Sequence, residues 1–481
     1  MSDARFPRVA SFKTAAAFRA HLDGAGIALE FDDTLLPPES SPLAQPLTVG
    51  DVRVGNRFCI LPMEGWDGNP DGTPSDLTTR RWTNFGRSGA KLIWGGEAVA
   101  VCLEGRANPN QLVINDGTIA ALAALRTAMV RTHTEQFGAR AGADLYAGLQ
   151  LTHSGRFAWP NGKATPEPLA AYAHPILDRR FAAGVSVLAD SDLDRLGDLF
   201  VHASKLALAA GFRFVDIKHC HGYLLHELLS ARARPGPYGG SLDNRTRFLR
   251  NVIDRIKLEV PGLDIAVRLS IFDTVPYRKG ALGRGEPEID PVDYEHAFGL
   301  LRDEQIDAAL QESRAVLTML QARGVKWICT TAGSPYYCPH VQRPAAFPPI
   351  DGYEPPEDPL RGVARQVDAT AVLKAEFPQL AFVGSAYSYL QEWLPNVAQF
   401  NVRTGLTDFV GLGRMVLSYP ELPADVLRGA PLRRKAICRT FSDCTTGPRM
   451  GLVSGCYPLD PFYAAQEDAI RLREIKDGAR T

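Results

Sequence analysis

Short apolar runs alternate with longer segments of helical periodicity along most of the chain. Eight runs have the length and the β-branched content of buried strands; they occupy residues 57–61, 90–94, 144–151, 214–217, 264–269, 326–330, 381–383 and 408–411. The helical segments between them cover residues 116–137, 191–210, 244–260, 311–323, 363–377 and 392–404. Strands that alternate with helices predict a parallel α/β sheet with right-handed crossovers, and the number of strands favours closure into a (β/α)8 TIM barrel. Periodicity alone leaves a doubly wound open sheet as the alternative.

Two extensions flank the predicted barrel. Residues 1–45 hold a short helical run and a Pro/Ser linker, which we interpret as an amino-terminal extension packed on a barrel of residues 46–430. Residues 431–481 form a carboxyl-terminal extension that contains cysteines. Within the barrel, loop 334–360 is long and rich in Pro and Tyr, so we expect an ordered lid over the functional site.

The composition is that of a soluble globular protein, and it narrows the classes of partner. Of 481 residues, 45% are hydrophobic and 22% are charged. Lys and Arg number 53 against 54 Asp and Glu, which gives no reason to expect a nucleic acid or an anionic membrane. No apolar run is long enough to span a bilayer and the first residues lack an apolar signal core, so we expect a cytoplasmic protein.

The densest cluster of reactive side chains follows the strand predicted at 214–217. Lys218, His219, His221 and Tyr223 lie within six positions there. Side chains at the carboxyl end of a barrel strand face the pocket where such folds keep their chemistry. These residue types can bind an anionic or carbonyl oxygen and deliver a proton. His219 should point to the opposite face of the strand and serve a structural role.

Four further strand ends carry groups suited to a planar ligand. Turn 61–65 could present backbone groups, although a strand-terminating proline is the simpler interpretation. Gly96 would let a flat ring approach the backbone closely, and Gln150 offers an amide that both donates and accepts. Arg268 lies in an apolar strand, so its charge requires a buried anion or a structural ion pair.

The ends of the last two strands suit a phosphate. Gly384 and Ser385 follow the seventh strand, and Gly413 and Arg414 follow the eighth. Barrels commonly bind phosphate in these two loops through backbone N–H groups, and an arginine adds a bidentate contact. The run GLGR is not a G-x-G-x-x-G fingerprint, so a Rossmann dinucleotide site is not supported.

Three motifs in order and spacing resemble the old yellow enzyme family of FMN-dependent oxidoreductases. They are Q-L-x-H-x-GR, HGYLLHELLS followed by YGGS-x-x-NR-x-RF, and G-x-GR, and the resemblance covers about residues 45–425. It implies a (β/α)8 barrel with FMN at its carboxyl face. It further implies contacts to the flavin ring and ribityl chain from Pro62, Met63, Gly96, Gln150 and Arg268. The phosphate would be held by Gly384, Gly413 and Arg414.

Two positions depart from the pattern of that family. The family usually places His-x-x-His or His-x-x-Asn before Gly-Tyr, whereas this chain has Lys218 and His221. An ammonium should favour a carboxylate, enolate or phenolate oxygen over a neutral ketone. Glu64 stands where the family has a small polar or sulfur residue that adjusts the flavin potential. Tyr223 matches the proton donor of the family.

The carboxyl-terminal extension resembles a degenerate iron–sulfur motif. Cys438, Cys444 and Cys456 match three ligand positions seen in trimethylamine dehydrogenase and 2,4-dienoyl-CoA reductase, but Phe441 occupies the second position. Because a 4Fe–4S cluster normally needs four thiolates, we expect a metal-free remnant, with a cluster or a zinc ion as alternatives.

These observations predict an NAD(P)H-dependent FMN oxidoreductase that reduces an activated C=C bond of a small-molecule substrate. Lys218 and His221 would hold the carbonyl oxygen, and Tyr223 would protonate the neighbouring carbon. One alternative is a flavin dehydrogenase that oxidises an amine or a saturated substrate with an external electron acceptor. Another is a flavin-binding protein with a degenerate site. Members of the family often associate, so a homo-oligomer is compatible with the sequence.

Overall fold

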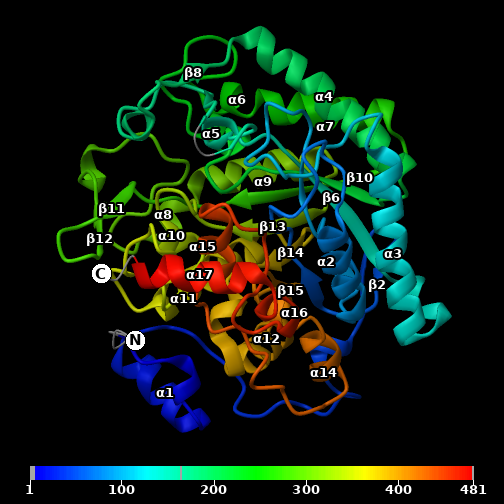
Figure 1. Ribbon diagram of the computed structural model, residues 1–481. Helices are drawn as coiled ribbons and strands as arrows, with labels where there is room; N and C mark the ends of the chain where they lie inside the picture. The colour runs from blue at the N-terminus through cyan, green and yellow to red at the C-terminus, as the bar shows by residue number, and fades with distance from the viewer. Residues whose placement is uncertain (1–5, 163–164, 479–481) are drawn as a thin grey trace.

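A closed barrel of parallel strands forms the centre of the protein (Figure 1). The computed structural model describes residues 6–162 and 165–478. The barrel strands are, in spatial order, β3 Phe58–Ile60, β4 Leu92–Ile93, β6 Tyr146–Thr152, β9 Phe214–Ile217, β10 Asp264–Ser270, β13 Trp327–Thr331, β14 Ala381–Gly384 and β15 Phe409–Leu412. Parallel pairings of β4 with β6 and of β15 with β3 complete the ring. The predicted (β/α)8 barrel is therefore confirmed, and the open-sheet alternative was wrong.

Alternation along each strand divides its side chains between two cores. In β9, Phe214 packs inside the barrel, whereas Val215 and Ile217 pack in the larger cluster under the helices. The inner cluster is aromatic and tight, and it includes Trp94, Tyr146, Phe214, Trp327 and Phe409. Its bulk fills the lower part of the barrel, so an open site can exist only at the rim.

The helices that cover the barrel are α2 Asp76–Arg87, α3 Ile119–Phe137, α4 Asp190–Ala209, α7 Arg247–Glu259, α9 Gln311–Ala322, α11 Pro359–Glu376 and α12 Leu394–Arg403. Of these, α2 is absent from the sequence prediction, because polar residues outnumber the apolar ones in this segment. Its start is nevertheless marked by a capping box, in which the Ser75 hydroxyl accepts from the Thr78 N–H at 3.2 Å.

Shorter elements decorate the rim and the ends of the barrel. The additional strands are β1 Leu47–Val49, β2 Val52–Val54, β5 Ala98–Ala100, β7 Leu169–Ala170, β8 Ser186–Val187, β11 Tyr277–Lys279 and β12 Gly285–Pro287. The additional helices are α5 Leu224–Leu229, α6 Leu242–Arg245, α8 Ile306–Ala309, α10 Pro339–Gln342, α13 Met415–Ser418 and α14 Leu422–Leu427.

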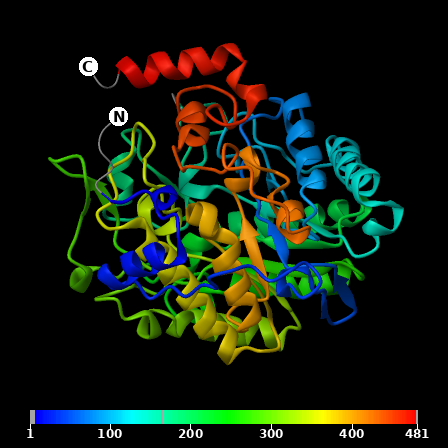
Figure 2. The ribbon, with the colours of Figure 1, turned by 90° about the horizontal axis from the view of Figure 1, so that it is seen from below.

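The two ends of the chain pack on the barrel from different sides. Helix α1, Ala15–Gly24, docks through Phe18, whose ring stacks on Trp393 at 5.1 Å between centroids. The carboxyl-terminal helices α15 Asp443–Arg449, α16 Pro461–Ala464 and α17 Glu467–Gly478 lie across the barrel mouth in Figure 1 and at its edge in Figure 2. None of the helices in the described ranges combines the length and the apolar character needed to cross a membrane.

Candidate active site

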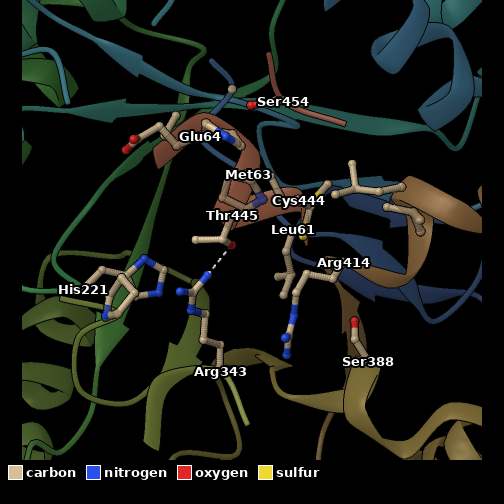
Figure 3. Close-up of a pocket in the computed structure, with 18 of the residues that line it drawn as sticks. Leu61, Met63, Glu64, His221, Arg343, Ser388, Arg414, Cys444, Thr445 and Ser454 are labelled. Atoms are coloured by element: carbon tan, nitrogen blue, oxygen red, sulfur yellow. Dashed lines mark hydrogen bonds between the residues drawn. The ribbon is translucent and has the colours of Figure 1, made fainter. Parts of the chain in front are cut away.

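A cavity of about 290 Å³ opens at the carboxyl ends of the barrel strands (Figure 3). This is the end at which barrels of this type carry their chemistry. Most of the residues that the sequence singles out meet in its wall. These residues are Pro62, Met63, Glu64, Gln150, Lys218, His221, Tyr223, Arg268, Ser385, Gly413 and Arg414.

Two glycines of the predicted cofactor site do not reach this wall. A Cβ atom on Gly96 would lie 3.2 Å from Phe85 and 3.3 Å from Trp82, so this glycine packs against helix α2. A Cβ atom on Gly384 would lie 3.2 Å from the ring of Tyr387. Their small size therefore serves internal packing, and a contact of their backbone with a ligand stays a prediction.

Asp216 forms the polar floor of the site and was missed in the sequence. Its carboxylate accepts from Trp94 Nε1 at 2.8 Å, from Gln150 Nε2 at 2.6 Å and from the Arg268 backbone N–H at 2.7 Å. These bonds fix the Gln150 amide so that its oxygen remains as the free acceptor. Burial raises the pKa of Asp216. The sequence did hold a signal for Asp216, which lies two positions before Lys218. Alternate residues along a strand face the same side, so both side chains face the barrel axis.

Arg268 brings a buried positive charge to the cavity, and this charge acts on the Asp216 carboxylate. Its side chain is 4% exposed, and no carboxylate of the described residues lies within ion-pair distance of it. The only partner of its guanidinium is the Pro62 carbonyl at 3.4 Å, and Nε has no partner. A buried unpaired donor is costly, so the missing partner favours a bound acceptor over the structural ion pair as the reason for Arg268. An electron-rich oxygen or nitrogen of a flavin ring would satisfy it.

Three further guanidinium groups line the cavity. Arg414 follows strand β15, Arg343 comes from loop 334–360 and Arg449 ends helix α15. Buried nitrogens of Arg414 and Arg343 have no partner, whereas Arg449 pairs with Asp351 at 2.8 Å. Burial and the neighbouring Arg449 and Arg414 lower the pKa of Arg343 to about 9. Open space beside Gly413 completes a cradle that fits a phosphate.

The carboxyl-terminal extension supplies part of the cavity wall, which the sequence did not indicate. Thr445 accepts from Arg343 at 2.6 Å, and Ser454 accepts from the Trp66 backbone N–H at 2.7 Å. Cys444 and Cys456 also line the cavity. Residues after the barrel therefore close its mouth, together with Tyr336, Gln342 and Arg343 of loop 334–360.

The predicted proton donor lies within a group of titratable side chains. The Tyr223 hydroxyl donates to Glu64 Oε2 and lies 2.7 Å from the Tyr336 hydroxyl. Lys218 Nζ lies 3.8 Å from the centre of the Tyr223 ring. Burial first, and Glu64 second, raise the pKa of Tyr223. Burial also raises the pKa of Glu64 and lowers the pKa of Lys218, while the attraction between their charges opposes both shifts.

His221 is held neutral in the wall. Its Nε2 lies 3.1 Å from the Gln342 amide nitrogen and 3.5 Å from the Thr331 hydroxyl. Because the amide nitrogen can only donate, we assign Nε2 as the acceptor and Nδ1 as the protonated atom. Burial and the charges of Arg268 and Lys218 hold the pKa of His221 well below its usual value.

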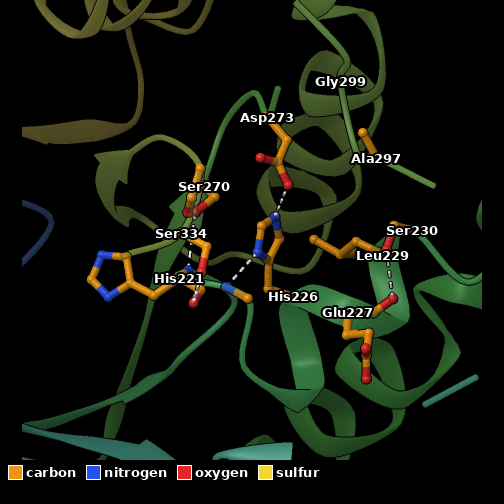
Figure 4. A network of polar contacts seen from close by, with 12 residues as sticks. His221, His226, Glu227, Leu229, Ser230, Ser270, Asp273, Ala297, Gly299 and Ser334 are labelled. Atoms are coloured by element: carbon orange, nitrogen blue, oxygen red, sulfur yellow. Dashed lines mark hydrogen bonds and ion pairs between the residues drawn. The ribbon is translucent and has the colours of Figure 1, made fainter. Parts of the chain in front are cut away.

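A buried polar network fixes the turn that presents His221 and Tyr223 (Figure 4). His221 has a φ of 68°, an unfavourable conformation for a side chain of this size. Ser270 accepts from its N–H at 3.1 Å and Ser334 donates to its carbonyl at 2.8 Å. His226 accepts from the Gly222 N–H at 2.8 Å and faces Asp273 at 3.9 Å. Contacts from strand β10, helix α5 and loop 334–360 thus stabilise the strained position.

The side chain of His219 lies away from the cavity. Its Nδ1 is 2.8 Å from the Ile217 carbonyl, and burial lowers its pKa to about 4. The three cysteines of the extension are free thiols, and mutual proximity together with burial raises the pKa of Cys456. Over the described ranges, no group of three or more His, Cys, Asp or Glu side chains is arranged to hold a metal ion.

Comparison with known proteins gives one matching family. The model of the NADH:flavin oxidoreductase / NADH oxidase family matches residues 42–289. NADPH dehydrogenase of Bacillus subtilis is 32% identical over 237 residues, which are 48% of this chain and 64% of that protein. NADH:flavin oxidoreductase FG08077 of Gibberella zeae is 28% identical over 263 residues, which are 50% of this chain and 59% of that protein. The chain thus spans less than two thirds of the length of both relatives.

Solved structures share the fold. A 2-naphthoyl-CoA reductase complex superposes with a TM-score of 0.64 at 17% identity, over 88% of this chain and 57% of that one. The old yellow enzyme homologue from Zymomonas mobilis gives 0.55 at 20% identity, over 82% and 94% of the chains. Histamine dehydrogenase from Rhizobium sp. 4-9 gives 0.58 at 21% identity, over 86% and 52%. Identities this low support the architecture alone.

Proposed function

Because the chain belongs to the NADH:flavin oxidoreductase / NADH oxidase family, we propose that it is an FMN-dependent oxidoreductase that uses NADPH or NADH to reduce an activated C=C bond. One observation carries the proposal. Lys218, His221 and Tyr223 meet in a single cavity with the unpaired guanidinium nitrogens of Arg268 and Arg414. Oxygen-binding groups, a proton donor and a binding site for a phosphorylated ring are thus combined.

The residues present fit the cofactor that the family implies. Pro62, Met63, Gln150 and Arg268 would contact the ring system, and Arg268 Nε would gain the acceptor that it lacks. The phosphate would take the cradle of Ser385, Gly413 and Arg414, and Arg343 is a further ligand that the sequence did not suggest. When bound, FMN supplies the hydride transfer between the nicotinamide and the substrate.

The polar side chains of the cavity stabilise the charge that develops on the substrate. Lys218 and His221 would bind the carbonyl oxygen that activates the double bond. Hydride addition turns that oxygen into an enolate, and a fixed ammonium in a buried site stabilises it more than water does. Tyr223 then donates its proton to the carbon next to the carbonyl. Lys218, which lies over the Tyr223 ring, would also stabilise the phenolate that this transfer leaves.

The test separates the two half-reactions of the holoprotein. Under anaerobic conditions, flavin bleaching by NADPH and by NADH is followed first, and reoxidation by a panel of enones second. Tyr223→Phe should slow reoxidation by at least about 100-fold, the usual scale of general acid catalysis, and leave bleaching within about twofold. Tyr463→Phe, which removes a hydroxyl from a different tyrosine of the cavity wall, is the control. Equal slowing of both half-reactions in Tyr223→Phe would exclude it as the donor.

A second candidate is a dehydrogenase that oxidises an amine or a saturated substrate and passes electrons to an external acceptor. The hydrogen bond from Tyr223 to the Glu64 carboxylate favours it, because that carboxylate could take up the proton such an oxidation releases. The same experiment discriminates. Bleaching by amines, with none by either nicotinamide, would favour the dehydrogenase over the reductase.

A further inference from the structure

Glu64 lies in direct contact with the predicted proton donor. It belongs to the turn after strand β3, and its carboxylate accepts from the Tyr223 hydroxyl. Its charge is opposed by Lys218, which lowers the pKa of Glu64 against the larger effect of burial. A flavin-adjusting role alone does not require a bond to Tyr223. The contact indicates that Glu64 takes part in proton transfer.

Tyr336 fixes the other side of the Tyr223 hydroxyl. The two hydroxyl oxygens are 2.7 Å apart. The Tyr336 ring stacks on Phe157 with 4.0 Å between centroids and 10° between planes, so its hydroxyl is held in place. After Tyr223 has donated its proton to a substrate, it needs another proton before the next cycle.

We propose that Glu64 is the proton store of the site and passes a proton to Tyr223 as Tyr223 protonates the substrate; this rests on the proposed function. The enolate electron pair forms a C–H bond with the Tyr223 proton while the Tyr223 O–H bond breaks. The Glu64 carboxyl O–H bond then breaks and the Tyr223 O–H bond forms again. Glu64 is left as a carboxylate opposite the Lys218 ammonium, and a solvent proton restores it.

The surroundings of Glu64 suit this role. Burial raises the pKa of its carboxyl group, so it holds a proton at higher pH than an exposed glutamate. Burial and Glu64 raise the pKa of Tyr223 well above its usual range, so a bare phenolate is disfavoured. The titratable or charged groups around the pair are Lys218, Tyr336, Arg343 and Arg449 on the cavity side and Asp67, Arg81 and Glu97 behind the turn.

The first arm of the test needs no turnover. Infrared titration of the holoprotein should show a protonated carboxyl band that is lost in Glu64→Gln. Because burial raises the pKa of Glu97 and of Asp273 to about 7, Glu97→Gln and Asp273→Asn are the controls that identify the other such bands. Tyr223→Phe removes a hydrogen bond that favours the charged form, so the Glu64 band should titrate at higher pH in this variant. An unchanged titration in Tyr223→Phe would overturn the proposal.

The second arm is the pH dependence of substrate protonation. In the unaltered protein, the rate of reoxidation by an enone should fall about tenfold per pH unit above the pH at which the Glu64 band titrates. Glu64→Gln should be slower at low pH and lack this fall. A fall that persists in Glu64→Gln would also overturn the relay. If no activated alkene reacts, the proposed function fails. The shift of the Glu64 band in Tyr223→Phe would still test the relay, because Tyr223 and Glu64 would pass a proton in the reverse direction during an oxidation.

Discussion

Replacing Asp216 by Asn should destabilise the protein by about 1–3 kcal/mol, the cost of one orphaned buried donor. Asp216 Oδ2 accepts from Trp94 and Gln150, and Oδ1 accepts from the Arg268 backbone N–H. Asparagine offers one oxygen in place of two. In its best orientation the oxygen keeps the two side-chain bonds and the NH2 group faces the Arg268 N–H, so two donors oppose each other. The easier burial of a neutral amide offsets part of the loss.

Thermal unfolding of the holoprotein at neutral pH measures this effect. Asp264→Asn is the matched control, because Asp264 begins the neighbouring strand β10, is exposed, and accepts from Tyr146 at the other end of the barrel. We expect a lower midpoint for Asp216→Asn and a midpoint within error of the unaltered protein for Asp264→Asn. Equal midpoints for the two variants would refute the reasoning, since they would mean that the bonds at the cavity floor carry no net stability.

Three further changes test the site and the core. Arg268→Met should lower the FMN content of the purified protein severalfold, measured by flavin absorbance per chain, because the cation facing the ring is lost. His219 is buried and neutral with a pKa lowered from 6.5 to about 4, so its stability contribution is complete above about pH 6.5 and is lost as pH falls toward 4. His219→Gln should therefore make thermal midpoints less sensitive to pH in that window. Lys218→Met and Glu64→Gln should each lower the midpoint of thermal unfolding. The double variant should be less destabilised than the sum of the two single variants by at least about 0.5 kcal/mol.

The sequence was sufficient for the barrel and for most of the wall of the cavity. Strand alternation and the carboxyl-end rule placed Lys218, His221 and Tyr223 together, because both rest on local backbone geometry. For Gly96 and Gly384 the same reasoning stays a prediction, because neither lines the cavity. A glycine can allow close approach of a ligand or of a neighbouring ring, and only the three-dimensional neighbours, Phe85 and Tyr387, decide which.

The missed residues required knowledge of contacts between distant segments. Arg343 and Tyr336 lie in a long irregular loop, and Thr445 lies beyond the barrel, so no periodicity relates them to the strand ends. Asp216 is different, because it lies on strand β9 two positions before Lys218, and this spacing places its side chain inside the barrel. A buried carboxylate beneath a ligand site needs donors, and the sequence did offer Gln150 at the end of the neighbouring strand.

The two departures from the family pattern, Lys218 and Glu64, carry opposite charges and act on the same side chain. An ammonium at position 218 or a carboxylate at position 64 alone would bury an uncompensated charge beside the ligand. In this protein Lys218 and Glu64 both contact Tyr223, one over its ring and the other at its hydroxyl. Each charge opposes the shift that burial imposes on the other. Once Glu64 has passed on its proton and is ionised, the cavity has the net charge of a site with neutral residues at both positions. The pair also supplies a cation for the substrate oxygen and an acid–base group for Tyr223.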